Sequence, residues 1–144
     1  MRSRGFSLIE LLVVLILLGI MAGVTGPAVG RFLDTLELKK QTEKVMATIR
    51  YARLAAITHG KLLVMTASEG EEGRSLTLSG AVEEVRPLGL SEETTLEIDP
   101  LELLFLPEGY GTPGTLTLKS GARSETIVID PLTALPMLEE DDDD

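Results

Sequence analysis

The chain has 144 residues, no cysteine, a single histidine (His59) and a formal net charge of −10 at pH 7. This length accommodates one folded domain and a further segment, but not two sizeable cores. Without cysteine the chain can form neither disulfides nor thiolate metal sites, and one histidine offers no catalytic constellation. We therefore expect no enzyme, no metal site and no cofactor. The acidic balance also argues against nucleic-acid binding, which needs clustered Lys and Arg.

The N-terminal end joins a short basic head to a long apolar run. Arg2 and Arg4 lie in the head, and residues 6–24 are almost wholly apolar apart from one acid, Glu10. As a helix these residues would be about 28 Å long, enough to cross a bilayer core of roughly 30 Å. The positive-inside rule keeps the head cytoplasmic and the remainder outside. An acid in such a segment costs roughly 2.5–3.5 kcal/mol on insertion scales, which indicates a functional reason for Glu10.

Beyond the apolar run, Gly26-Pro27 weakens the helix, and helical character then returns. The spacing in residues 28–60 predicts an amphipathic helix, because one set of small or apolar residues recurs every three or four positions. Gly60 is a natural C-terminal cap, and His59 is interpreted as a residue of the last helical turn rather than a ligand. The predicted buried stripe consists of Leu38, Thr42, Val45, Ile49, Ala52 and Ala56.

After Gly60 the pattern alternates, which predicts short strands in one or two antiparallel sheets. The runs Glu69-Gly70-Glu71-Glu72-Gly73 and Pro107-Glu108-Gly109-Tyr110-Gly111 are typical of turns. The first of these and the acidic residues 139–144 could bind calcium, but solvated charge runs are the favoured interpretation. The strands are expected at residues 61–67, 74–79, 81–87, 94–98, 103–106, 115–119 and 125–130.

The N-terminal motif has a specific resemblance. Gly5-Phe6-Ser7-Leu8-Ile9-Glu10-Leu11-Leu12-Val13-Val14 closely resembles the class III signal of type IV pilins and type II secretion pseudopilins. The resemblance implies that a prepilin peptidase cuts between Gly5 and Phe6 and methylates the new N-terminus on Phe6. It also implies that Glu10 guides subunit assembly, and Pro27 matches a proline common in the family's helix.

Two other interpretations of this segment stay open. An ordinary signal peptide would be cut near Ala22 or Gly23, where small residues occur. A simple membrane anchor would let Glu10 reach the interface. The Gly-Phe-x-x-x-Glu placement favours the pilin-like signal over both.

A second stretch narrows the resemblance. The segment from Ile49 to Gly60, with an Arg-x-Ala-Arg run at Arg50 and Arg53, is similar to the helix end of H-type minor pseudopilins (GspH) and FimT-like minor pilins. Phe105-Leu106-Pro107-Glu108-Gly109 and the following Gly114-Thr115-Leu116-Thr117-Leu118 fit the later part of that family. Arg50 and Arg53 could contact DNA, as proposed for FimT-like uptake pilins, although the acidic surroundings disfavour it.

The resemblance implies an α+β pilin-like fold. A leader, residues 1–5, precedes a long helix whose first part, 6–27, spans the membrane and whose second part, 28–60, packs on a small antiparallel β domain, 61–138. Residues 139–144 form a disordered acidic tail.

The implied function is that of a minor pseudopilin, a structural subunit that helps to assemble a type II secretion pseudopilus. The alternative is a minor type IV pilin for adhesion, twitching motility or DNA uptake. The expected partners are other pilin or pseudopilin subunits, the prepilin peptidase and the inner-membrane assembly platform. The protein would be a single-pass inner-membrane protein with a periplasmic C-terminal domain before it enters the fibre.

Overall fold

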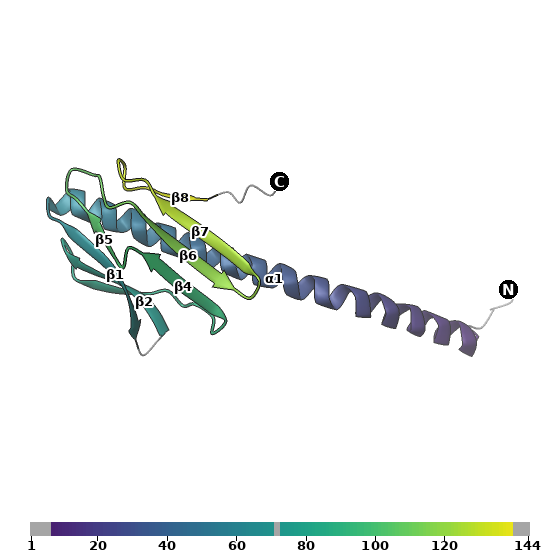
Figure 1. The fold of residues 1–144 in the computed structure, drawn as a ribbon. Coiled ribbons are helices and arrows are strands. Elements are labelled where there is room, and N and C mark those ends of the chain that lie inside the picture. The colour runs from purple at the N-terminus through teal and green to yellow at the C-terminus, as the bar shows by residue number, and fades with distance from the viewer. Residues whose placement is uncertain (1–6, 71–72, 140–144) are drawn as a thin grey trace, which may run out of the picture. The chain divides into compact units, whose positions relative to one another are not determined.

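The computed structural model describes residues 7–70 and 73–139, without the side chains of residues 24–28, 31 and 70. It consists of one helix, α1 (Leu8–His59), followed by short strands (Figure 1). The chain divides into two compact units, residues 1–37 and residues 38–144, and α1 contributes to both. The helical assignment continues through Gly26 and Pro27, so the predicted weak point does not end the helix.

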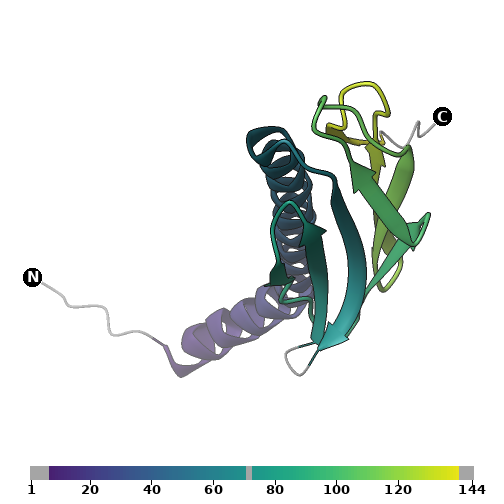
Figure 2. The ribbon, with the colours of Figure 1, turned by 90° about the vertical axis from the view of Figure 1, so that its left-hand side faces the viewer.

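The second unit contains two four-stranded antiparallel sheets. The first has the order β3-β2-β1-β5 and the second the order β4-β6-β7-β8. In Figure 2 the helical residues of this unit lie on one side of the strands. The fold is α+β, as predicted. The strands are β1 (Leu63–Gly70), β2 (Gly73–Gly80), β3 (Glu84–Pro87), β4 (Thr94–Asp99), β5 (Glu102–Phe105), β6 (Gly114–Ser120), β7 (Arg123–Ile129) and β8 (Pro136–Leu138).

One hydrophobic core joins the helix to both sheets. Each sheet contributes alternate residues to it, as expected for strands with one buried face. The predicted stripe of α1 is confirmed, because all six of its residues are at most 3% exposed. Fully buried side chains from the helix and the two sheets include Ile49, Leu63, Met65, Leu76, Leu78, Phe105, Leu116, Leu118, Ile127 and Ile129.

The helix ends at His59 in the way that the sequence predicts. Gly60 has φ 61°, and its N–H donates to the Ile57 carbonyl while the N–H of Lys61 donates to the Ala56 carbonyl. These two bonds form a Schellman motif, which needs a left-handed residue after the cap. The ring Nδ1 of His59 lies 2.9 Å from the Ala55 carbonyl oxygen.

The strands differ from the predictions by more than two residues in three places. Strand β1 continues through Glu69 and Gly70, which were predicted to lie in a turn, because each pairs with a residue of β2. The strand predicted at 81–87 begins only at Glu84, since the Gly80 N–H donates to the Glu83 carboxylate and closes a turn there. Strand β8 was not predicted, because three residues beginning with Pro136 show no alternation.

Candidate functional site

Glu10 lies in the first turn of α1. The backbone N–H groups of Glu10 and Leu11 donate to the Ser7 carbonyl at 3.0 and 3.2 Å, so Ser7 caps the helix and Glu10 is its third residue. Ser-x-x-Glu is the capping-box spacing, and an acid in the first turn is favoured by the helix dipole. This local role was not predicted, although the same spacing before an apolar run is its usual sequence signal.

The predicted cleavage and methylation positions, Gly5 and Phe6, lie outside the described residues, as do Arg2 and Arg4 of the basic head. In the sequence Phe6 directly precedes the cap residue Ser7. Cleavage after Gly5 would therefore leave an amine on Phe6, two residues before the first helical residue, Leu8. The positions of Gly5 and Phe6 as processing sites stay predictions.

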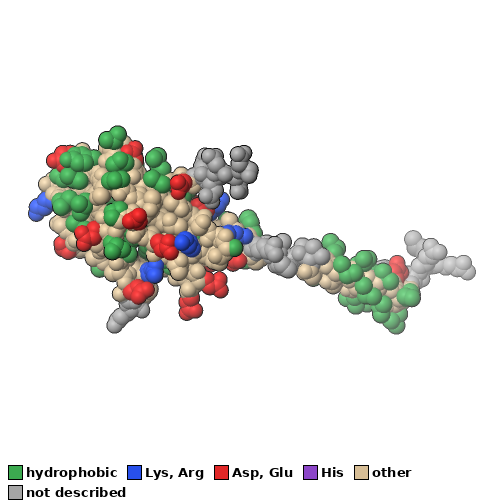
Figure 3. All heavy atoms as spheres, viewed as in Figure 1, with side chains coloured by type: hydrophobic (Ala, Val, Ile, Leu, Met, Phe, Trp, Pro, Cys, Tyr) green, Lys and Arg blue, Asp and Glu red, His purple; other side chains and the backbone are tan. Residues whose placement is uncertain are grey.

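The helix of the first unit carries many apolar side chains near its N-terminal end (Figure 3). The large apolar side chains between residues 8 and 21 are 44–85% exposed. A contiguous apolar surface of this kind marks a contact with another protein or with a membrane. Among the described residues, no stretch of helix is both long and apolar enough to cross a membrane. The exposed apolar residues are Leu8, Ile9, Leu11, Leu12, Val13, Val14, Leu15, Ile16, Leu17, Leu18, Ile20 and Met21.

The first unit also has exposed apolar residues after Pro27. Val29, Phe32, Leu33 and Leu36 are all exposed, and their spacing places them on one face of α1. Because residues 28–60 were predicted to bury an apolar face from Leu38 onward, this earlier stripe was not predicted as a separate exposed surface. Its spacing is that of a helix face that packs against another helix.

Arg50 and Arg53, the residues considered for DNA contact, have different surroundings. The Nε of Arg53 donates to the backbone carbonyl of Thr133 at 2.6 Å and to that of Gly109 at 3.4 Å. Arg53 therefore joins α1 to two loops of the β domain. Arg50 is exposed, and the described residues offer it no hydrogen bond or ion pair.

The acidic runs show no metal site in the part of the chain that the structure describes. Glu69 lies beside Arg74, with its carboxylate oxygen 3.6 Å from the guanidinium Nε. The remaining acids of that run, Glu71 and Glu72, and residues 140–144 of the tail fall outside the described residues. Calcium binding by these residues is therefore not tested, and solvated charge runs remain the favoured interpretation.

Comparisons with known proteins fit this geometry. Residues 1–26 match the prokaryotic N-terminal methylation motif, and residues 41–133 match the family of type II transport protein GspH. No protein of curated function matches the chain.

Two solved structures share the fold, both of the type IV minor pilin FimU of Pseudomonas aeruginosa in different crystal forms. The first is 18% identical with a TM-score of 0.62, and the match covers 76% of this chain and 92% of FimU. The second is 19% identical with a TM-score of 0.58, covering 72% and 93%. At this identity the likeness shows a common fold only. Since the GspH match spans well over half of the sequence, this chain belongs to the GspH family and is a minor pseudopilin.

Proposed function

We propose that the chain is made as a precursor, cut between Gly5 and Phe6, methylated on Phe6 and assembled through α1 into a type II secretion pseudopilus. In this role it is a structural subunit and a substrate of the prepilin peptidase, not an enzyme. The observation that carries the proposal is the exposed apolar helix surface that surrounds one acid, Glu10. The match of residues 1–26 to the N-terminal methylation motif supports the processing step.

Before assembly, residues 6–27 anchor the subunit in the inner membrane, and the β domain faces the periplasm. Arg2 and Arg4 precede the apolar run. The positive-inside rule assigns these two arginines to the cytoplasmic side. As a helix, the apolar residues 6–24 of this anchor would be about 28 Å long, close to the bilayer core of roughly 30 Å. The second stripe, from Val29 to Leu36, lies beyond this anchor and gives neighbouring subunits a packing surface in the fibre.

Glu10 sets the register of the subunit in the fibre. In an apolar environment its carboxylate needs a partner, and the amine of Phe6 on a neighbouring subunit is a positive charge at the same end of the helix. The net energy of such a pair is small, because desolvation of both ions offsets much of the attraction. A misplaced subunit, however, leaves a charge unpaired among apolar side chains, so the pair acts mainly on specificity.

The test replaces Glu10 with alanine in cells that assemble the fibre. We expect Glu10→Ala to be cut and methylated normally. Its amount in the fibre fraction should fall on the order of tenfold, since the Phe6 amine of a neighbouring subunit is then left unpaired and docking is disfavoured. The measurement is the amount of subunit in sheared fibres relative to the membrane, by quantitative blotting.

Asp34→Ala is the matched control, because Asp34 is another exposed acid of the same helix that lies beyond the anchor. It should enter fibres at the wild-type level. Normal incorporation of Glu10→Ala would show that Glu10 does not direct docking. Equal losses in both variants would show an effect of acid removal that is unrelated to position.

A type IV pilus is the second candidate, because two solved structures with this fold are of a type IV minor pilin. A deletion strain separates the two systems. Loss of protein secretion with intact twitching and DNA uptake supports the pseudopilus, and the opposite result supports the pilus. The inner-membrane assembly platform is the expected partner in either case.

A further inference from the structure

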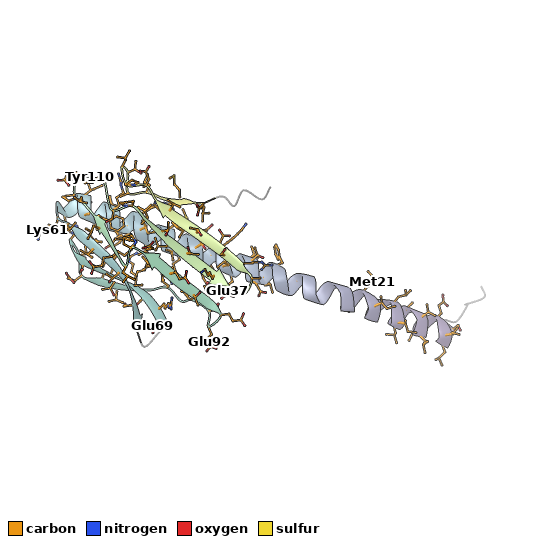
Figure 4. All side chains as sticks on the ribbon, in the orientation of Figure 1. Met21, Glu37, Lys61, Glu69, Glu92 and Tyr110 are labelled. Atoms are coloured by element: carbon orange, nitrogen blue, oxygen red, sulfur yellow. The ribbon has the colours of Figure 1, made fainter. Side chains whose placement is uncertain are left out.

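The two sheets leave a groove of about 530 Å³ between the β1–β2 hairpin and strand β4. One wall consists of residues 66–69 and Arg74, and the opposite wall of residues 96–98. Leu101 and Glu102, which follow the turn from β4 to β5, also line it. Figure 4 labels Glu69 at the end of the β domain that also carries Glu92, and Lys61 and Tyr110 at the other end.

The β4 wall presents an open strand edge. Among the strands that the structure describes, β4 is the outermost strand of its sheet and pairs only with β6. The Leu96 carbonyl accepts a hydrogen bond from Arg74 on the other wall, so the backbone groups of Leu96 point away from β6 and into the groove. In an antiparallel ladder this orientation alternates, so Ile98 also turns its N–H and carbonyl toward the groove.

The β1 wall presents a second open edge. The Leu104 carbonyl accepts a hydrogen bond from the Thr112 N–H at 2.9 Å, so the backbone groups of Leu104 point away from β1. The ladder bonds between β5 and β1 therefore involve Met65, which pairs with Leu103, and the residues that alternate with Met65 along β1. Pairing with β5 ends at Thr66. Beyond that point the backbone N–H and carbonyl groups of Ala67 and Glu69 point to the same side as those of Met65, where no strand of the described chain lies beside them.

We propose that this groove binds an extended segment of a partner protein, which adds a strand to the edge of β4 and carries apolar and basic side chains in alternation. An open edge binds an extended chain through backbone hydrogen bonds, and pockets between the strands select alternate side chains. Leu101, 81% exposed, and the half-buried Ile98 offer apolar contacts.

Charge identifies the occupant as a basic segment of another protein. Glu102 is exposed and has no ionic partner among the described residues, and Glu69 is 79% exposed on its side chain. Arg74 is the single basic residue of the lining and already contacts Glu69. The acidic residues 139–144 of the same chain would be repelled, and a second copy would bring a further net charge of −10.

Arg74 protects the open edge of β4 from unselective strand pairing while the groove is empty. Its side chain crosses to the Leu96 carbonyl and places a charge on a strand edge, a usual means of preventing unwanted strand pairing. A carbonyl oxygen accepts two hydrogen bonds, so an incoming segment can bond to Leu96 beside Arg74. The groove is therefore open to a selected segment without a rearrangement of the sheets.

The experiment measures binding of fluorescent peptides to the full chain in neutral detergent micelles. One peptide alternates valine with lysine, and its counterpart alternates valine with glutamate. We expect the lysine peptide to bind and Ile98→Pro to weaken it on the order of tenfold, because proline removes an N–H that faces the groove. Leu138→Pro is the matched control. It places proline on the other edge of the same sheet, where the backbone groups of Leu138 also point away from the neighbouring strand, β7. The Leu138→Pro variant should bind the lysine peptide as the wild type does.

Two further readouts keep the proposal testable if Ile98→Pro does not fold. Glu102→Lys should lower the preference for the lysine peptide over the glutamate peptide, and bound peptide should slow amide hydrogen exchange at Leu96 and Ile98. The proposal is overturned if neither peptide binds, if both bind equally, or if protection appears elsewhere. It is also overturned if a second copy of the chain occupies the groove, seen as a dimer with protection at β4.

Discussion

The Nε of Arg53 donates to the Thr133 carbonyl at 2.6 Å, which joins α1 to a loop 80 residues further along the chain. The same group reaches the Gly109 carbonyl. One charged side chain therefore fixes two loops on the end of the helix. Hydrogen bonds from a charged donor contribute about 1.5–3 kcal/mol, and partial exposure lowers that value.

We expect Arg53→Ala to lower the free energy of unfolding of the β domain by about 1–2 kcal/mol, because two backbone carbonyls lose their partner. Chemical denaturation of the full chain in micelles, followed by circular dichroism of the strands, measures it. Arg50→Ala is the control three residues earlier, and it should stay within about 0.5 kcal/mol of wild type. If both substitutions were equally mild, Arg53 would not hold the loops.

Gly80 should be the glycine least tolerant of alanine. Its φ is 102°, and a Cβ there would clash with the Leu62 carbonyl oxygen. Gly60 also has positive φ, but no atom lies near its Cβ position. We expect Gly60→Ala to cost about 1 kcal/mol from backbone strain alone. Gly80→Ala should cost at least about 2 kcal/mol, since the clash is with backbone that cannot move freely.

Thermal unfolding of the two glycine variants under the same conditions checks this order. The Gly80 variant should have the lower midpoint. A Gly60 variant that unfolds at the lower temperature would contradict the roles assigned to the two positions.

Ile49 anchors α1 in the hydrophobic core. It is fully buried, whereas Leu54, on the same helix, is 58% exposed. We expect Ile49→Ala to destabilise the β domain by about 2–5 kcal/mol, from lost burial and the cavity that remains. Leu54→Ala should change stability by at most about 0.5 kcal/mol. Denaturation midpoints of the pair measure the difference, and similar midpoints would show that the helix contributes little to this core.

The helix was predictable from the sequence because its signals are local. A spacing of three and four residues located the buried stripe, and Gly60 marked the C-terminal end through its left-handed backbone. Alternation likewise predicted seven of the eight strands found in residues 7–70 and 73–139. Strand β8 escaped because it is short and begins with Pro136.

The features that depend on distant parts of the chain were not predictable. The link from Arg53 to Thr133 spans 80 positions, and no local pattern marks it. The groove exists because β5 begins at Glu102, opposite Thr66, and leaves the rest of β1 unpaired on that side among the described residues, while β4 joins the other sheet. Strand order and strand ends depend on tertiary packing, so neither the groove nor the role of Arg74 could be seen in the sequence.

The proposed processing of the N-terminus has its most direct test in the intact mass of the protein extracted from membranes or fibres of cells with an active prepilin peptidase. We predict a single species that lacks residues 1–5 and carries one added methyl group, with fragmentation placing the methyl on Phe6. A chain that keeps Met1, or one cut near Ala22 or Gly23, would contradict the account.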